Sequence, residues 1–263
     1  DLEFFRISED HAAGLHAFVR GLKKSGPPKD AKFLKGHLTG PFTFATTLKD
    51  EKGADIAYNE VVFDAITKGL AMKAAWQIGL LKQFGLPVII FIDDPAVGTL
   101  GSAFSAVSAE DVSRKLNEII DVIHGHGGIA GTHCCGNADW PIFFRSNVDI
   151  VNFDAFGFLD KVLLYPDDIK RFYARGGALA WGIVPTGDFT GTETADGLEV
   201  KLEDGIGRLA ANGIDRQTIL RRALITPSCG MGSLTPEKAL AILKLTREVS
   251  DRMQQKLRTQ GAA

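Results

Sequence analysis

Apolar and polar positions along the chain form two recurring patterns. Short apolar runs rich in β-branched residues end in Gly, Pro or Asp, which is typical of buried strands. Amphipathic stretches follow these runs and are typical of helices. Six strands are predicted in this way, over residues 31–38, 86–92, 128–132, 149–153, 178–184 and 223–226.

Helices are expected between the strands, several with a recognisable start signal. Ser108 followed by Asp111 is a typical N-cap pair, and Thr235 followed by Pro236 marks another helix start. The polar segment 188–203 is rich in Gly and Thr, and it is expected to be a loop that serves as a lid, as a partner surface or as ordinary surface. The predicted helices are residues 8–24, 55–84, 108–124, 166–174 and a final one from 235.

Regular alternation of strands and helices predicts a parallel sheet. A closed (β/α)8 TIM barrel needs eight strands, so the six predicted strands are two short. The sequence starts at Asp1 rather than Met, and we expect the two absent strands to precede it. An open doubly wound sheet is the alternative, but no glycine-rich phosphate loop follows any strand. The pattern therefore favours a single catalytic α/β barrel domain over residues 1–263 that lacks its first two strands.

Composition excludes several classes of protein. The chain has 263 residues, of which 45% are hydrophobic and 24% charged, the profile of a soluble globular protein. Its 30 Lys and Arg against 32 Asp and Glu give a net charge of -2, which argues against a nucleic-acid partner. The longest apolar run, residues 86–92, is too short to span a membrane, and no signal peptide is evident. A cytoplasmic, reducing location is therefore expected.

Several predicted strand ends carry metal ligands or acids, and in an α/β barrel these ends converge on one mouth. His133 and Cys135 are two residues apart and point the same way in an extended chain, whereas Cys134 points the other way. A lone His-x-Cys can also be a buried histidine and thiol. Together with Cys229 and Asp154 at other strand ends, however, it offers one imidazole, two thiolates and one carboxylate, a plausible zinc shell.

Such a shell favours one kind of chemistry. Two thiolates, one carboxylate and Zn²⁺ sum to a net charge of -1, which is poor for activating water but suits binding a substrate thiol as its thiolate. A free thiol is only about 3% ionised at pH 7, so full ionisation raises the reactive fraction about 30-fold. The predicted site is therefore one that activates a thiol.

Three further residues are candidates for binding substrate. Asp93 and Asp94 leave three interpretations open: an acid–base pair, a site for a substrate ammonium, or caps for the turn before Pro95. Because adjacent strand residues face opposite sides, only one of the two is expected to reach the mouth. His37 precedes the turn at 39–41, and it either lines the mouth or belongs to the core.

Five short motifs together carry a resemblance to a known family. They are Gly-Pro-Phe-Thr at 40–43, Ile-Asp-Asp-Pro at 92–95, His-Cys-Cys-Gly-Asn at 133–137, Asp-Ile-Val-Asn-Phe-Asp at 149–154 and Thr-Pro-Ser-Cys-Gly at 226–230. In this order they resemble the uroporphyrinogen decarboxylase/methionine synthase superfamily, and more closely the short core form of the cobalamin-independent methionine synthase barrel. The resemblance implies an eight-stranded barrel, homocysteine held through its amino group by Asp93, and zinc held by His133, Cys135, Asp154 and Cys229.

The chain departs from the family pattern at three places. The family usually has Glu at the position of Asp154, and its Gly-Ser-x-Pro substrate loop would lie ahead of Asp1. Its folate-using long form has a histidine after the strand that matches 178–184, whereas residues 185–191 contain none. A folate amine needs a proton to leave, but a Co(I) corrinoid does not. The third departure therefore favours a methyl-corrinoid as donor, either free or carried on a partner protein.

The leading hypothesis is a zinc-dependent methyltransferase that moves a methyl group from methylcobalamin or a corrinoid protein to homocysteine. Transfer to coenzyme M by the same zinc chemistry is the nearest alternative. A metal-free enzyme resembling uroporphyrinogen decarboxylase and a non-catalytic partner of a corrinoid protein are the other two.

Overall fold

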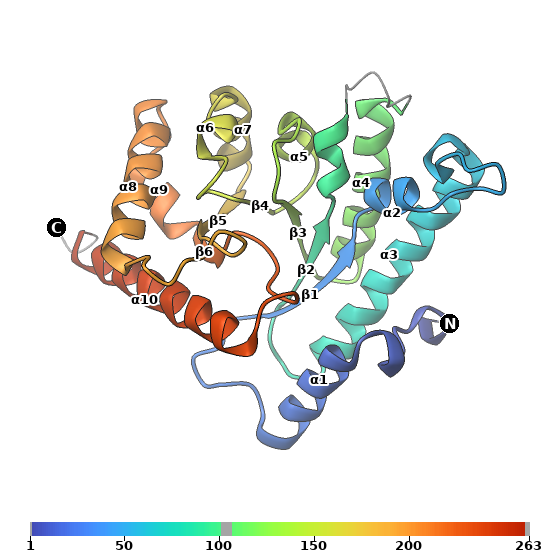
Figure 1. Ribbon diagram of the computed structural model, residues 1–263, viewed down its shortest axis with the longest axis horizontal. Coiled ribbons are helices and arrows are strands. Elements are labelled where there is room, and N and C mark those ends of the chain that lie inside the picture. Colours follow the sequence, from blue (N-terminus) through green and yellow to red (C-terminus); the bar gives the residue numbers. More distant parts are fainter. Residues whose placement is uncertain (1, 101–106, 261–263) are drawn as a thin grey trace. The chain divides into compact units, whose positions relative to one another are not determined.

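The computed structural model describes residues 2–100 and 107–260 of the chain. Six strands alternate with helices, and their order in the sheet follows the chain from β1 to β6 (Figure 1). A doubly wound sheet would instead reverse its strand order at a switch point. The sequential order confirms the α/β class with the winding of a TIM barrel. The strands are β1 Leu34–Thr39, β2 Val88–Asp93, β3 Ile129–Cys134, β4 Ile150–Phe153, β5 Ala178–Val184 and β6 Ala223–Pro227.

Internal contacts divide the chain into two compact units. The N-terminal unit is Asp1–Thr132 with Ser146–Val148, and the C-terminal unit is His133–Arg145 with Asp149–Ala263. The boundary falls within β3, so that His133 belongs to the C-terminal unit together with the strands β4, β5 and β6.

In the N-terminal unit β1 and β2 pair in parallel, from Leu34 opposite Val88 to Thr39 opposite Asp93. Buried and exposed residues alternate along β1, and His37 lies on the exposed face. His37 is therefore not a core residue, which removes one of its two interpretations. The helices of this unit are η1 Leu2–Phe5, η2 Glu9–His11, α1 Ala13–Ser25, α2 Pro41–Thr47, η3 Ile56–Tyr58, α3 Glu60–Lys82, η4 Pro95–Thr99 and α4 Ala109–Gly125.

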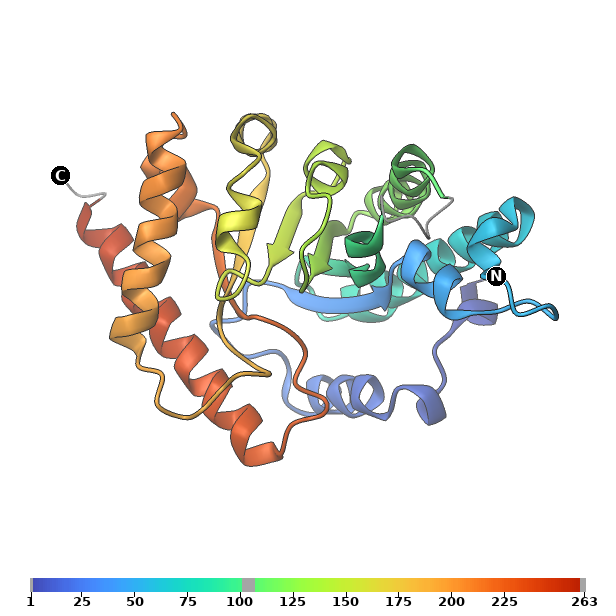
Figure 2. The same cartoon turned by 45° about the horizontal axis from the view of Figure 1, so that its top comes forward.

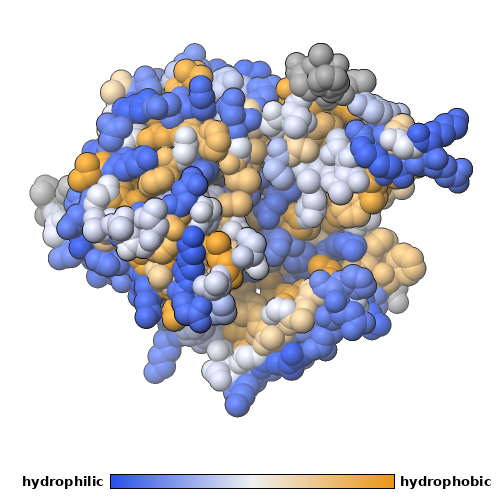
Figure 3. Space-filling view, in the orientation of Figure 1, coloured by the Kyte–Doolittle hydropathy of each residue, from blue (hydrophilic) through white to orange (hydrophobic). Residues whose placement is uncertain are grey.

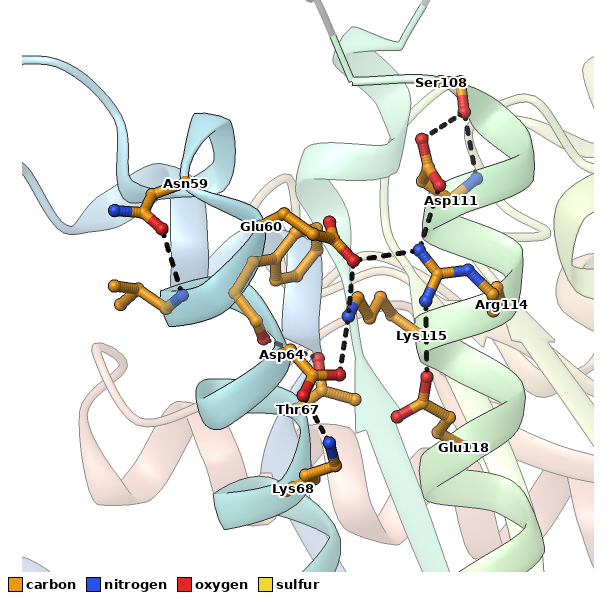
Figure 4. Close-up of polar contacts among 12 residues, drawn as sticks. Asn59, Glu60, Asp64, Thr67, Lys68, Ser108, Asp111, Arg114, Lys115 and Glu118 are labelled. Atoms are coloured by element: carbon orange, nitrogen blue, oxygen red, sulfur yellow. Dashed lines mark hydrogen bonds and ion pairs between the residues drawn. The ribbon is translucent and has the colours of Figure 1, made fainter.

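Helices α3 and α4 lie side by side and are joined by a network of charged side chains (Figure 4). The side chain of Lys115 is fully buried, with its Nζ 2.9 Å from Asp64 Oδ1, 3.1 Å from Glu60 Oε1 and 5.5 Å from the centre of the Phe63 ring. Burial alone would lower the pKa of Lys115, but its hydrogen bonds to the two carboxylates raise it overall. The network thus holds one buried cation between an exposed carboxylate, Glu60, and a half-buried one, Asp64.

In the C-terminal unit β4, β5 and β6 pair in parallel. An aromatic cluster fills its core, where the Trp140 and Phe153 ring centres are 6.0 Å apart and those of Phe153 and Trp181 are 5.4 Å apart. Helices α8 and α10 pack against each other and against β5 (Figure 2). The helices of this unit are α5 Pro141–Arg145, α6 Leu159–Val162, α7 Pro166–Ala174, α8 Ala195–Ala211, α9 Arg216–Arg221 and α10 Pro236–Gln260.

The prediction of a loop over 188–203 is wrong for its second half. Helix α8 begins at Ala195, and the Thr194 side chain caps it by accepting a hydrogen bond from Gly197 N at 3.2 Å. Leu198 and Leu202 are buried one helical turn apart. The apolar stripe of α8 therefore outweighs the loop-like composition of the segment.

The surface seen in Figure 3 is mostly hydrophilic along the helices. Apolar residues show at the N-terminal segment, where Phe4 of η1 is 85% exposed. Among the helices of residues 2–100 and 107–260, none is long and apolar enough to cross a bilayer.

Candidate metal centre

Three side chains of the C-terminal unit converge as a set of metal ligands. They are His133 and Cys135 at the end of β3 and Cys229 after β6. One ligand atom from each lies within 4.8 Å of the other two. The sequence separates Cys229 from the other two by more than ninety residues, so the parallel sheet brings the three together. Three of the four predicted metal ligands are thus placed in one group.

The local geometry of β3 explains why His133 and Cys135 take part and Cys134 does not. Side chains alternate between the two sides of an extended chain. His133 and Cys135 are half-buried, whereas Cys134 is only 1% exposed. The predicted opposite orientation of Cys134 agrees with this burial. Cys134 is thus a buried thiol outside the group of three.

The thiol of Cys229 is prepared for ionisation by its neighbours. A hydrogen bond with His133 lowers the pKa of Cys229, and hydrogen bonds with Cys135 and the Gly230 backbone lower it further, although burial opposes them. Thiolates rather than thiols bind metal ions. The site therefore favours the ligand form of this cysteine.

His133 is held from its other side by a residue that the sequence argument did not identify. Its Nδ1 lies 2.6 Å from Asn152 Oδ1. The Asn152 amide nitrogen donates to Ala180 O at 2.8 Å and to Thr226 Oγ1 at 3.0 Å. The sequence contains one indication that Asn152 lies near the site. Asn152 precedes Asp154 by two residues on a strand, so both share one face.

Asp154, the fourth predicted ligand, follows the end of β4 and is half-buried. Its Oδ1 accepts a hydrogen bond from Gly157 N at 2.8 Å, which closes a turn after the strand. Burial raises the pKa of Asp154, although hydrogen bonds from the backbone of Gly157 and Phe156 oppose this. Asp154 is outside the group formed by the imidazole and the two thiols. Its role as a ligand stays a prediction.

The Asp94 side chain, in the N-terminal unit, is buried and fully engaged in hydrogen bonds. It is 1% exposed, and its carboxylate accepts hydrogen bonds from Thr43 N at 2.7 Å, Thr43 Oγ1 at 2.5 Å and Phe42 N at 3.2 Å. These amides belong to the first turn of α2, so Asp94 caps that helix rather than the turn before Pro95. A Cβ atom on Gly40 would meet the Asp94 side chain at 2.3 Å, which explains the glycine there.

The other two substrate-binding candidates are accessible. Asp93 is half-buried at the end of β2, opposite Thr39 of β1. His37 lines a cavity of about 470 Å³ in the N-terminal unit, together with Lys35 and Gln77. Because Asp94 is occupied as a cap, Asp93 is the member of the aspartate pair that stays available for a substrate ammonium.

Comparison with solved structures finds proteins of similar fold. A candidate vitamin-B12-independent methionine synthase from Listeria monocytogenes matches with a TM-score of 0.56 and 16% identity, over 92% of this chain and 69% of that one. A dihydropteroate synthase from Anaplasma phagocytophilum gives a TM-score of 0.44 and 18% identity, over 81% and 72%. No protein-family model and no curated protein matches the sequence. At 16% identity the first similarity establishes the fold alone.

Proposed function

We propose that the chain is a zinc-dependent methyltransferase that transfers a methyl group from a methyl-corrinoid to the thiol of homocysteine. The observation that carries this proposal is the convergence of His133, Cys135 and Cys229 within 4.8 Å. The order of the five sequence motifs and the similarity of fold to a candidate methionine synthase support it.

The donor set suits zinc. One imidazole and two thiols are the nitrogen and sulfur ligands that Zn²⁺ prefers, and three protein ligands leave a position for a substrate. Hard cations such as Mg²⁺ prefer oxygen ligands, of which this group has none. His133, Cys135 and Cys229 would hold the metal, and Asp154 is the proposed fourth ligand, which would yield its place to the substrate thiol.

Zinc bound there would hold the substrate thiol as a thiolate at neutral pH. The chain's own residues supply the surroundings of this step. Hydrogen bonds keep the pKa of Cys229 low, which favours its ligand form. In the N-terminal unit, Asp93 offers a carboxylate for the ammonium of an amino-acid substrate.

The choice of a corrinoid as donor is based on whether the leaving group needs a proton. Residues 185–191 contain no histidine that could protonate a leaving amine. A Co(I) corrinoid leaves without a proton, so it does not need such a general acid. The proposed donor is therefore methylcobalamin, either free or bound to a carrier protein.

The test is demethylation of methylcobalamin, followed by absorbance, in reducing buffer with zinc. Homocysteine should be methylated by the wild type, and coenzyme M should react more slowly. Cys229→Ser should lose the activity at least about 100-fold, because it removes a proposed metal ligand. Cys134→Ala is the matched control and should retain it.

Demethylation that is faster with coenzyme M would move the acceptor to that thiol and keep the zinc chemistry. Wild-type protein that binds zinc yet leaves methylcobalamin intact with both thiols would overturn the proposed reaction. Equal activity in Cys229→Ser and wild type would overturn the assigned site.

A further inference from the structure

We propose that Asn152 is a positioning residue that keeps a proton on Nδ1 of the His133 imidazole and turns Nε2 toward the two thiols. The metal-binding consequence of this proposal rests on the proposed function, whereas the tautomer does not.

The carbonyl oxygen of Ala180 can only accept a hydrogen bond. It lies 2.8 Å from the side-chain amide of Asn152, so the group that faces it must be the NH2. The opposite orientation would place two acceptor oxygens in contact. A backbone atom of β5 therefore determines which way the amide points, a choice that a side-chain partner alone would leave open.

With the amide oriented, its oxygen faces His133. Asn152 Oδ1 and His133 Nδ1 are 2.6 Å apart, and an amide oxygen cannot donate. The proton of this hydrogen bond must therefore be on Nδ1. In a neutral imidazole the other nitrogen, Nε2, then carries the free lone pair.

The surroundings make this arrangement difficult to replace. Asn152 is 6% exposed, so little water reaches the amide. Its second N–H donates to Thr226 Oγ1 at 3.0 Å, which leaves neither amide hydrogen without a partner. A buried polar group with every partner in place is costly to rearrange. Strands β3, β4, β5 and β6 all contribute to this chain of hydrogen bonds.

The second ring nitrogen is placed where a metal ligand is needed. One ring nitrogen of His133 lies within 4.8 Å of the Cys135 and Cys229 sulfurs, and Nδ1 is already engaged by Asn152. Nε2 is therefore the nitrogen that faces the thiols. A second hydrogen bond on a ligand histidine sets its tautomer and ring orientation, and losing it typically costs about 10- to 100-fold in metal affinity.

Two variants separate positioning from a general structural role. Asn152→Leu has similar bulk and offers no acceptor, so His133 should lose its preference for the Nδ1–H form. Asn152→Asp keeps an acceptor for Nδ1–H and should restore that preference, although its second oxygen then faces the Ala180 carbonyl and costs stability. Thr226→Val removes only the outer anchor of the amide and should leave the Nδ1–H form in place. It is the variant to measure if Asn152→Leu does not fold.

The measurement is long-range ¹H–¹⁵N NMR of histidine rings in the metal-free protein, which reports the tautomer directly. Zinc affinity is then measured by competition with a chromophoric chelator. We expect Nδ1–H for His133 in the wild type and in Asn152→Asp. We expect zinc affinity to fall by about 10- to 100-fold in Asn152→Leu and to recover largely in Asn152→Asp.

A His133 ring that carries no proton on Nδ1 in the folded wild type would overturn the inference. So would unchanged tautomer and unchanged zinc affinity in Asn152→Leu, even if methyl transfer is confirmed. The opposite result, an Nδ1–H tautomer in a protein that transfers no methyl group, would support the inference on the tautomer and count against the proposed function alone.

Discussion

The chemistry of this chain depends on single residues whose surroundings differ sharply although their types are the same. The three cysteines are one example: Cys134 is buried, Cys135 is half-buried and Cys229 is exposed. The hydrogen bond with His133 lowers the pKa of Cys229. Because reactivity follows thiolate content and access, the three thiols should be distinguishable in solution.

In metal-free, reduced protein we expect iodoacetamide to alkylate Cys229 at least about 10-fold faster than Cys134, because Cys229 is exposed and its pKa is lowered, whereas Cys134 is buried. Zinc should slow the reaction at Cys135 and Cys229 and leave Cys134 unaffected. Mass spectrometry of quenched time points measures the three rates. Similar rates at Cys134 and Cys229 would contradict the environments described for them.

Asp94 leads to a prediction about pH. Burial raises the pKa of Asp94 to about 6, against hydrogen bonds from Thr43 and Phe42. The unfolded chain binds this proton only below about pH 4. Protonation of Asp94 therefore stabilises the fold below about pH 4, and this contribution, roughly 3 kcal/mol, is lost as pH rises through 6.

Urea unfolding between pH 4 and 7 measures this effect. Asp94→Asn cannot titrate, so the free energy of unfolding of the wild type should fall relative to this variant as pH rises. The variant should also be less stable in absolute terms at pH 4, because its NH2 group faces the amides of α2. A difference between the two proteins that stays constant with pH would refute the assignment.

At the scale of elements, local patterns predicted most of the fold. The Pro166–Ala174 helix and the Ala178–Val184 strand have the predicted bounds, because their start signals and apolar runs are local. Helix α2 could not be predicted in this way, since its cap comes from Asp94, more than fifty residues later. Helix α8 was missed because a Gly- and Thr-rich stretch precedes its cap at Thr194.

The candidate site shows the same division between local and distant information. Alternation along a strand predicted that His133 and Cys135 act together and that Cys134 does not. The role of Asn152 depends on Ala180 and Thr226, which lie on two later strands. Spacing along one strand can show that two side chains share a face, but it does not show which distant backbone atom orients them.

The ion network between α3 and α4 gives a prediction at this scale. Replacing Lys115 by Met removes the buried cation and leaves Glu60 and Asp64 partly exposed to water. Replacing both partners in Glu60→Gln/Asp64→Asn leaves the buried ammonium without a counter-charge, which is the costlier defect.

Thermal unfolding followed by circular dichroism should show a change in Tm of less than about 3 °C for Lys115→Met and a loss of about 8 °C for the double variant. The order of the two effects is the test. A larger loss in Lys115→Met than in the double variant would show that the cation, rather than its pairing, carries the stability of this contact.

At the scale of the whole molecule, strand order argues for the fold and the metal ligands argue for the function. The sequential order β1 to β6 is that of a barrel, and it places the ends of distant strands where their side chains meet. The similarity to a candidate methionine synthase at 16% identity agrees with the fold. Neither the strand order nor the structural similarity identifies the reaction, so the proposed function depends on whether the three ligands hold a metal ion.

The most direct test is the zinc content of the purified, reduced chain after incubation with zinc and removal of the excess, measured by mass spectrometry of the metal. We expect about one zinc per chain in the wild type and in Cys134→Ala, and little in Cys229→Ser, which lacks one of the three proposed ligands. A folded wild-type protein that retains no zinc, or a Cys229→Ser variant that retains as much as the wild type, would contradict it.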